Sequence, residues 1–363
     1  MLSLSADIKK VIIVMEKFLP LEHIEKLRTL ITTAQNIVLT CHVSPDGDAI
    51  GAMLAMKNFL ERKGKQVLAV VPNIYPDFLK WLPGACDICI YEKNEEVLLP
   101  KLTCADLFFF LDFNGLNRMS TLAEPVMENT NAVRVLVDHH LNPELNSCHL
   151  MFSYAEMSST CELLYHLLVE LEGEDNLTHD EAVCIYTGMM TDTGGFTYNS
   201  NRSSVYYIIA KLLEKGIDKD KIYRNVFYDY SADRFRLLGF MLYVKMDILP
   251  EYNAVLLSLT REEQKRFSHK KGDTEGFVNM PLQIRGTRLS IFLRENTEQD
   301  NIRVSLRSVD DFPCNQMAAE FFNGGGHLNA SGGQLECSLD EALEIARKAV
   351  RKYAPLLRGN KIS

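Results

Sequence analysis

A carboxylate and two imidazoles stand directly after an apolar run in the segment AVRVLVDHHLNP, residues 132–143. Asp138, His139 and His140 are residue types that bind metal ions, transfer protons or donate hydrogen bonds. A short apolar run is typical of a buried strand, and polar groups beyond its carboxyl end are typical of a functional crevice in a parallel sheet. A strand-end histidine can also only cap a loop, so this segment alone leaves both interpretations open.

Three further segments place similar side chains after predicted elements. The run NIVLT leads into CHVSPDGDAIG, which holds His42, Asp46 and Asp48, the run LFFFL precedes Asp112, and GMMTDTGG holds Asp192. Taken singly, Asp-Gly-Asp often forms a turn, and an aspartate at a helix end often contacts only solvent. Their occurrence together is what indicates a shared site.

The elements that must position these residues alternate between strand and helix. Apolar runs predict strands over 36–40, 65–71, 105–113 and 133–140, and 3.6-residue periodicity predicts helices over 49–64, 158–173, 178–192 and 201–216. An amphipathic helical pattern also covers residues 1–35. The alternation predicts an α/β fold whose parallel sheet is flanked by helices on both faces.

In such a sheet the four segments would converge on one crevice beyond the carboxyl ends of the strands. Four carboxylates at that place would repel one another unless cations neutralised them. Carboxylate oxygens with a few imidazoles suit Mn²⁺, Mg²⁺ or Fe²⁺. Two divalent ions would balance the four negative charges, so the count favours a site with two metal ions.

The pattern changes after about residue 245. Short alternating strands over 252–260, 287–295 and 301–309, with helices over 315–322 and at the end of the chain, predict a smaller α+β domain. We therefore expect one domain over 20–245 that carries the metal site, a second over 250–355 that binds substrate, and a cleft between them.

The second domain contains a glycine-rich segment, FFNGGGHLNASGG, residues 321–333. Glycines let backbone N–H groups approach an anion closely, and His327 adds a side-chain donor. On the preceding strand, period-two alternation places Arg303, Ser305 and Arg307 on one face, which suits phosphate oxygens. The alternatives to phosphate binding are a plain glycine turn for the loop and a solvated face for the strand.

Composition limits the classes of partner. The formal net charge of −9 argues against a general grip on long nucleic acid. No apolar run reaches the length of a membrane span or of a signal-peptide core. Nine cysteines are scattered, and a lone Cys86-x-x-Cys89 is weak support for a metal site. We expect free thiols in a soluble, cytoplasmic protein.

The motifs HVSPDGDAIGA, LDFN, VDHHLNP, MMTDTGGF and GGGHLNASGG, in this order, resemble those of the DHH phosphoesterase superfamily with its DHHA1 C-terminal domain. The resemblance covers about residues 20–355. Within the superfamily the chain is similar to the bifunctional oligoribonucleases, or nanoRNases, that also act as pAp phosphatases.

The resemblance implies a site for two Mn²⁺ ions, with His42 and Asp46 on the first, His139 and Asp192 on the second, and Asp48 and Asp112 bridging or flanking both. It implies catalytic roles for Asp138, which would orient the ligands through His139, and for His140, which would lie near the substrate or behind the ligands. It also implies that the substrate's far phosphate or nucleotide is held by Arg307, Gly324, Gly325, Gly326 and His327, to which the strand pattern adds Arg303 and Ser305 as substrate-binding residues.

The activity that the resemblance implies is hydrolysis of very short oligoribonucleotides to nucleoside 5′-monophosphates, of 3′-phosphoadenosine 5′-phosphate (pAp) to AMP, or of both. The alternatives are a phosphodiesterase for cyclic di-AMP or pApA, an exopolyphosphatase, and a nucleotide-binding regulator without catalysis. The sequence leaves the oligomeric state open, a homodimer included. Ala52 and Phe113 depart from the usual motif residues, and Phe113 is expected to alter the pocket wall.

Overall fold

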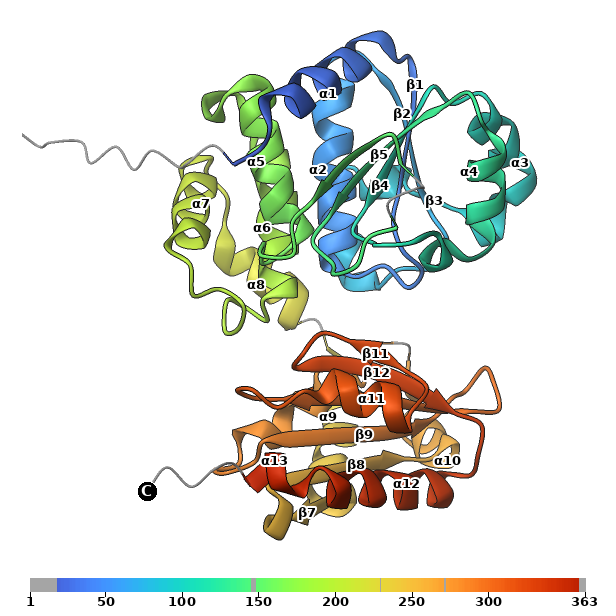
Figure 1. Ribbon diagram of the computed structural model, residues 1–363, viewed down its shortest axis with the longest axis vertical. Coiled ribbons are helices and arrows are strands. Elements are labelled where there is room, and N and C mark those ends of the chain that lie inside the picture. Colours follow the sequence, from blue (N-terminus) through green and yellow to red (C-terminus); the bar gives the residue numbers. More distant parts are fainter. Residues whose placement is uncertain (1–17, 145–147, 229, 271, 359–363) are drawn as a thin grey trace, which may run out of the picture. The chain divides into compact units, whose positions relative to one another are not determined.

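The computed structural model describes residues 18–144, 148–228, 230–270 and 272–358, and the chain forms two compact units, Met1–Asp229 and Tyr230–Ser363 (Figure 1). The helix predicted over residues 1–35 is confirmed only as α1, Leu21–Thr33, because its first part lies outside the described residues. Among the described residues, no helix combines the length and the apolar composition that crossing a bilayer requires.

Unit 1 contains a six-stranded sheet in the order β3-β2-β1-β4-β5-β6, with every neighbouring pair parallel. Its strands are β1 (Asn36–Thr40), β2 (Gln66–Val71), β3 (Cys89–Ile90), β4 (Leu107–Leu111), β5 (Val133–Asp138) and β6 (Leu150–Ser153). The strand order reverses between β1 and β4, and such a reversal opens a crevice at the carboxyl ends of the two strands.

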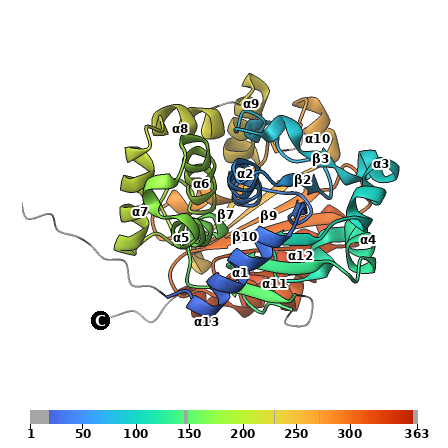
Figure 2. The ribbon, with the colours of Figure 1, turned by 90° about the horizontal axis from the view of Figure 1, so that it is seen from above.

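Helices cover both faces of this sheet, as predicted. They are α1, α2 (Gly47–Arg62), α3 (Tyr91–Thr103), α4 (Ala123–Glu128), α5 (Thr160–Glu172), α6 (His179–Asp192), α7 (Ser203–Glu214) and α8 (Lys219–Phe227). Leu39 packs with the larger group of helices, whereas Val38, its neighbour, packs with α3 and α4 on the other face. Figure 2 shows α7 and α8 as an outer row beside α5 and α6.

Unit 2 contains a six-stranded mixed sheet in the order β11-β12-β10-β9-β8-β7. Its strands are β7 (Met246–Leu249), β8 (Ala254–Leu259), β9 (Leu289–Glu295), β10 (Ile302–Ser308), β11 (Gly325–Gly326) and β12 (Ala330–Leu335), and its helices are α9 (Ala232–Phe240), α10 (Arg261–Arg266), α11 (Cys314–Phe321), α12 (Leu339–Lys352) and α13 (Ala354–Arg358). Helices α11 and α12 pack on the face that carries Val304 and Leu306, so the predicted α+β class is confirmed.

The division between the units falls earlier than the predicted boundary at residues 245–250. Helix α9 precedes that boundary, yet its Leu237 is buried with Leu257 and Phe292 in a cluster of unit 2. The apolar periodicity of α9 shows that one face is buried, but it does not show which core covers that face. The cleft between the domains stays a prediction.

Candidate metal centre

All the residues predicted for catalysis and metal binding gather at the carboxyl edge of the unit 1 sheet. They follow β1, β4 and β5, begin α2 and end α6, and they are His42, Asp46, Asp48, Asp112, Asp138, His139, His140 and Asp192. Within this set, three groups of side chains bring their ligand atoms within 4.8 Å of one another: His42-Asp46-Asp112, Asp48-His139-Asp192 and Asp112-His139-His140. The site lies beside the reversal point between β1 and β4.

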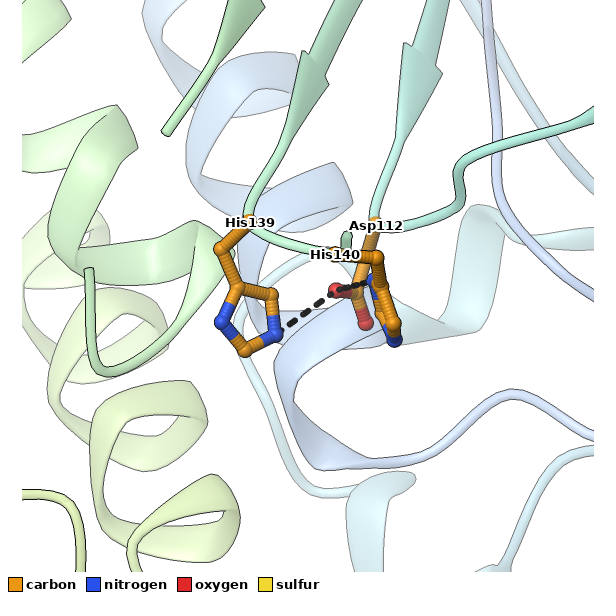
Figure 3. A group of neighbouring side chains, drawn as sticks. All are labelled: Asp112, His139 and His140. Carbon is orange, nitrogen blue, oxygen red and sulfur yellow. Dashed lines mark ion pairs between the residues drawn. The ribbon is translucent and has the colours of Figure 1, made fainter. Parts of the chain in front are cut away.

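Asp112 stands at the centre of the site (Figure 3). Its carboxylate lies 3.5 Å from His42 Nε2 on one side and 3.7 Å from His139 Nε2 on the other. Directly after β4 the backbone of Asp112 takes a positive φ of 66°, a conformation that aspartate tolerates better than most residues. The turn aims the carboxylate between the two histidines, and the side chain is only 2% exposed.

The first group joins β1 to α2. His42 Nε2 lies 3.8 Å from Asp46 Oδ2, and His42 Nδ1 lies 2.8 Å from the Val43 carbonyl oxygen. A carbonyl at this distance holds the proton on Nδ1 and directs the Nε2 lone pair into the site, as in histidine metal ligands. Asp46 also caps α2 by accepting the backbone N–H groups of Asp48 and Ala49, so the helix start itself fixes the group.

The second group joins α2, β5 and α6. His139 Nε2 lies 3.5 Å from Asp192 Oδ2 and 3.9 Å from Asp48 Oδ2, and His139 Nδ1 lies 3.3 Å from the Met157 carbonyl oxygen. The pattern repeats that of His42, because Nδ1 faces a backbone oxygen and Nε2 faces carboxylates. The two groups therefore present the same kind of donor set on either side of Asp112.

Asp138 orients a different histidine from the one that we predicted. Its Oδ1 lies 2.7 Å from Nδ1 of His140, whereas we expected it to act through His139. His139 and His140 leave the strand in different directions (Figure 3), and only the loop conformation decides which ring turns toward Asp138. Asp138 is fully buried, so this contact fixes the His140 ring from the protein interior.

Small residues bring α2 and α6 close enough to join Asp48 and Asp192. A Cβ atom on Gly51 would lie 2.6 Å from the Cys184 carbonyl oxygen, and one on Gly47 or Gly188 would overlap Thr191 or Cys161. Because the helix backbones approach so closely, larger side chains at these glycines would push the two carboxylates apart.

Thr160 is a functional residue that the sequence analysis missed. Its hydroxyl donates to Asp112 Oδ1 at 2.8 Å, and its backbone N–H donates to Asp48 Oδ2 at 2.6 Å. The next N–H, of Cys161, reaches Asp48 Oδ1 at 2.9 Å. The first turn of α5 thus holds two carboxylates of the centre, as the positive end of a helix favours. The signal in the sequence is Ser159, a helix-capping residue placed directly before Thr160.

The side chains of the centre do not neutralise one another completely. Burial and then the charge of Asp112 raise the pKa of Asp48 to about 7, and burial and then the charge of Asp48 raise the pKa of Asp192. Burial lowers the pKa of His42, but the hydrogen bond with Asp112 and the charge of Asp46 outweigh it and raise the pKa to about 9. The raised pKa values of these buried carboxylates mark a place where a cation is favoured.

The donor set fits divalent metal ions. It combines carboxylate oxygens with imidazole nitrogens and contains no thiolate, which suits Mn²⁺, Mg²⁺ or Fe²⁺. The side chain of Asp46 is 52% exposed and that of Asp192 is 30% exposed, so the outer side of the centre is open to solvent, while Asp48 and Asp112 are buried.

In unit 2 the predicted strand face is present. Along β10, Val304 and Leu306 are buried, whereas Arg303 is exposed and Ser305 and Arg307 are half-buried. Among the described residues no carboxylate lies within ion-pair distance of Arg303 or Arg307, and Arg307 Nη1 donates to the Leu306 carbonyl oxygen at 2.9 Å. The alternation of this strand is confirmed, and its role in substrate binding stays a prediction.

The glycine loop has two kinds of glycine. Gly324 and Gly326 pack so closely on β12 that a Cβ atom would overlap its backbone, and Gly326 has a φ of 141°. Gly325 has open space around the position of a Cβ atom. His327 continues the turn, with its N–H bonded to the Ala330 carbonyl oxygen at 2.8 Å. Packing therefore explains Gly324 and Gly326 but does not explain Gly325.

One expectation about the pocket wall is wrong. Phe113 is 1% exposed, and its ring packs in a core cluster with the ring centroid 5.4 Å from that of Phe110. It lies in the protein interior and does not line the pocket, because the turn at Asp112 directs the following residue back into the core. Ala52 is likewise fully buried in α2.

Comparison with known families gives two matches. Residues 36–189 match the DHH family, N-terminal domain, and residues 255–354 match the DHHA1 domain. Among curated proteins, the chain is 28% identical over 318 residues to the bifunctional oligoribonuclease and PAP phosphatase NrnA of Thermus thermophilus, covering 87% of this chain and 89% of that protein. It is 23% identical over 337 residues to the cyclic-di-AMP phosphodiesterase GdpP of Bacillus subtilis, covering 90% of this chain and 49% of GdpP.

Solved structures include a similar protein of nearly the same length. An exopolyphosphatase-related protein from Bacteroides fragilis is 48% identical, with a TM-score of 0.91, and the match covers 95% of this chain and all of that one. A manganese-bound exonuclease RecJ has a TM-score of 0.51 at 17% identity, covering 93% of this chain and 95% of RecJ, which shows a likeness of fold alone.

Proposed function

The chain belongs to the DHH family of phosphoesterases and is a hydrolytic enzyme, and from this premise we propose that it is a Mn²⁺-dependent enzyme for very short oligoribonucleotides and pAp. Its products would be nucleoside 5′-monophosphates from RNA and AMP from pAp. The name and the near-complete coverage of the NrnA relative support this substrate class.

The observation that carries the proposal is the position of Asp112 between two matching donor groups. On one side lie His42 and Asp46, and on the other lie His139 and Asp192. We propose that each pair holds one divalent ion and that Asp48 and Asp112 contribute to both. When bound, two such ions would lower the pKa of a water molecule and polarise the phosphoryl oxygens. RecJ, which shares the fold, is a manganese-bound protein, and this favours Mn²⁺.

Other residues of the chain would position the substrate and its protons. With Asp138 on Nδ1, the His140 ring is fixed, and its Nε2 is the atom that would donate a hydrogen bond to a phosphoryl or leaving oxygen. The buried contacts of Thr160 would keep Asp48 and Asp112 in place, so that little reorganisation is needed during the reaction.

Unit 2 would bind the part of the substrate that does not react. Arg307 offers a guanidinium without a carboxylate partner among the described residues, and Gly325 and His327 belong to a turn with open space at Gly325. We propose that Arg307, Gly324, Gly325, Gly326 and His327 bind a phosphate or nucleotide that a minimal ester lacks, and that Arg303 and Ser305 extend the substrate-binding face along β10.

The second candidate is a phosphodiesterase for cyclic di-AMP or pApA, which the GdpP relative favours. Polyphosphate is a third candidate substrate, because the Bacteroides fragilis protein is described as exopolyphosphatase-related. Cytoplasmic location and a homodimer stay predictions.

One experiment separates these candidates. The purified full chain with Mn²⁺ is assayed on pAp, a two-nucleotide RNA, a long RNA, cyclic di-AMP, pApA and polyphosphate, with Asp112→Asn as the control for contaminating hydrolases. We expect the largest kcat/KM for the two-nucleotide RNA and pAp. A larger kcat/KM for cyclic di-AMP, pApA or polyphosphate would assign the enzyme to that substrate class.

A further inference from the structure

Two arginines lie directly opposite each other on neighbouring strands of unit 2. Arg294 on β9 is the register partner of Arg303 on β10, so both side chains project from the same face of the sheet. Helices α11 and α12 cover the other face, which carries Leu293 and Val304. Like charges directly opposite each other destabilise a strand pair, so this pair is unfavourable for folding alone.

Among the described residues no carboxylate contacts the pair directly, although the charge of Glu298 acts on Arg294 from beyond ion-pair distance. The half-buried Arg294 has its Nη1 3.2 Å from His269 Nε2 and 3.0 Å from Thr274 Oγ1. Burial and then Arg294 lower the pKa of His269, so both partners are neutral at pH 7. Among the described residues, no carboxylate lies within ion-pair distance of Arg294 or Arg303. A buried charge normally has a counter-charge, and here a ligand would supply it.

A cavity of about 450 Å³ adjoins the pair at His269. It is lined by Arg261, Gln264, Lys265, Ser268, His269 and Thr297. Arg261 is held by Asp300 at 3.0 Å, whereas Lys265 forms no ion pair with any residue that the structure describes. The lining contains cationic, amide and hydroxyl groups and no carboxylate, which is the chemistry of an anion site.

This place is separate from the Arg307 end of the strand. Arg303 and Arg307 are four positions apart along β10, which is roughly 14 Å at about 3.4 Å per residue and too far for one phosphate group. We propose that Arg294, Arg303 and the adjoining cavity form a second phosphate site, which binds a backbone phosphate of an oligoribonucleotide longer than two nucleotides. The inference rests on the proposed function and adds a length preference to it.

Binding is measured by fluorescence anisotropy in EDTA, so that no hydrolysis occurs, with labelled RNAs of two and five nucleotides and the full chain. In Arg303→Gln, we expect the affinity for five nucleotides to fall about tenfold more than the affinity for two, because one charge-assisted contact is lost. The salt dependence for five nucleotides should become shallower. The matched control is Lys348→Gln, an exposed residue of α12 on the other side of the sheet, which should change neither affinity.

A stability measurement tests the same site independently. Without RNA, Arg303→Gln should unfold at the wild-type Tm or above it, because a like-charge contact is removed. Five-nucleotide RNA should raise the Tm of the wild type more than that of the variant. A lower Tm with unchanged RNA affinity would show that the arginine pair has only a structural role. An equal loss of affinity for both RNA lengths would show that the pair belongs to the same binding site as Arg307. Failure of the hydrolysis assay would refute the proposed function while leaving this binding difference measurable.

Discussion

The two units carry local excesses of charge of opposite sign. In unit 1, four carboxylates meet three imidazoles, and Asp48 and Asp112 are almost completely buried. In unit 2, Arg294, Arg303 and Arg307 share one sheet face, and none has a carboxylate within ion-pair distance among the described residues. An excess of either sign costs free energy in the protein alone and is relieved by a bound counter-ion. Divalent cations would neutralise the carboxylates of unit 1, and the phosphate groups of a phosphoester would neutralise the arginines of unit 2.

The two regions also differ in how firmly they are fixed. Thr160 and Cys161 hold the carboxylates of unit 1 by buried hydrogen bonds of 2.6–2.9 Å. The arginines of unit 2 are half-buried or exposed, and the nearby turn depends on glycine. We therefore expect changes in unit 1 to abolish activity and changes in unit 2 to reduce it in a substrate-dependent way.

The largest effect is expected at Asp112. Asp112→Asn removes the charge between the two donor groups, which should lower kcat for pAp by about 10³-fold or more, the equivalent of several kcal/mol. Bound manganese, measured by mass spectrometry after desalting, should fall as well. EDTA should abolish the activity of the wild type, and added Mn²⁺ should restore that activity. Full activity in EDTA would contradict the role of this cluster as a metal centre.

Thr160 tests whether the fixed position of the carboxylates matters. Thr160→Val keeps the shape but removes the hydroxyl donor to Asp112, so Mn²⁺ affinity, followed by electron paramagnetic resonance of free Mn²⁺, should fall about 10–100-fold. Thr160→Ser should retain most of the affinity. The matched control is Thr187→Val, because among the described residues the buried Thr187 hydroxyl donates only to the Val183 carbonyl oxygen of its own helix. If the Ser variant behaves like the Val variant, methyl packing is responsible.

Arg307 tests whether unit 2 binds part of the substrate while unit 1 carries out the hydrolysis. Arg307→Ala should lower kcat/KM for pAp or a dinucleotide about tenfold to a hundredfold, through loss of a charge-assisted contact of about 1.5–3 kcal/mol. It should have little effect on p-nitrophenyl phenylphosphonate, which has no second phosphate, and manganese content should not change. Equal losses on both substrates would mean that unit 2 does not act as a separate substrate clamp.

Gly325 provides a smaller and more local test. A methyl group fits at this position, so Gly325→Ala should keep the wild-type Tm while raising the KM for pAp by less than about tenfold, because the methyl group blocks close approach to the backbone. Gly324→Ala is the contrasting variant, since its Cβ would overlap the Gly332 carbonyl oxygen and should lower the Tm. An unchanged KM in Gly325→Ala would leave the loop as a plain turn.

No effect is expected at Cys86 and Cys89. Cys86 Sγ lies 3.6 Å from Asp87 Oδ1, and Cys89 Sγ lies 3.8 Å from the Asp87 carbonyl oxygen. Among the described residues, neither thiol belongs to a cluster of side chains that could bind a metal ion. The double change to serine should leave kcat/KM and manganese content at wild-type values. A loss of bound metal would reveal a second metal site in unit 1.

Local patterns in the sequence determined much of the fold. The apolar runs of β4 and β5 and the alternation of β10 predict burial correctly, because burial follows directly from side-chain periodicity. The polar residues after these strands converge because parallel strands end at one edge of the sheet. Strands β3 and β6 were not predicted, since two and four residues are too few to show a period.

Only the tertiary structure decided which side chains touch. The hydroxyl of Thr160 reaches Asp112 across 48 residues and its N–H reaches Asp48 across 112, and no local pattern encodes such contacts. Asp138 bonds His140 where we expected it to act through His139, because loop dihedrals set the direction of each ring. The sequence by itself therefore determined the elements and the chemistry at their ends, while helix packing and loop geometry decided the partners of each residue.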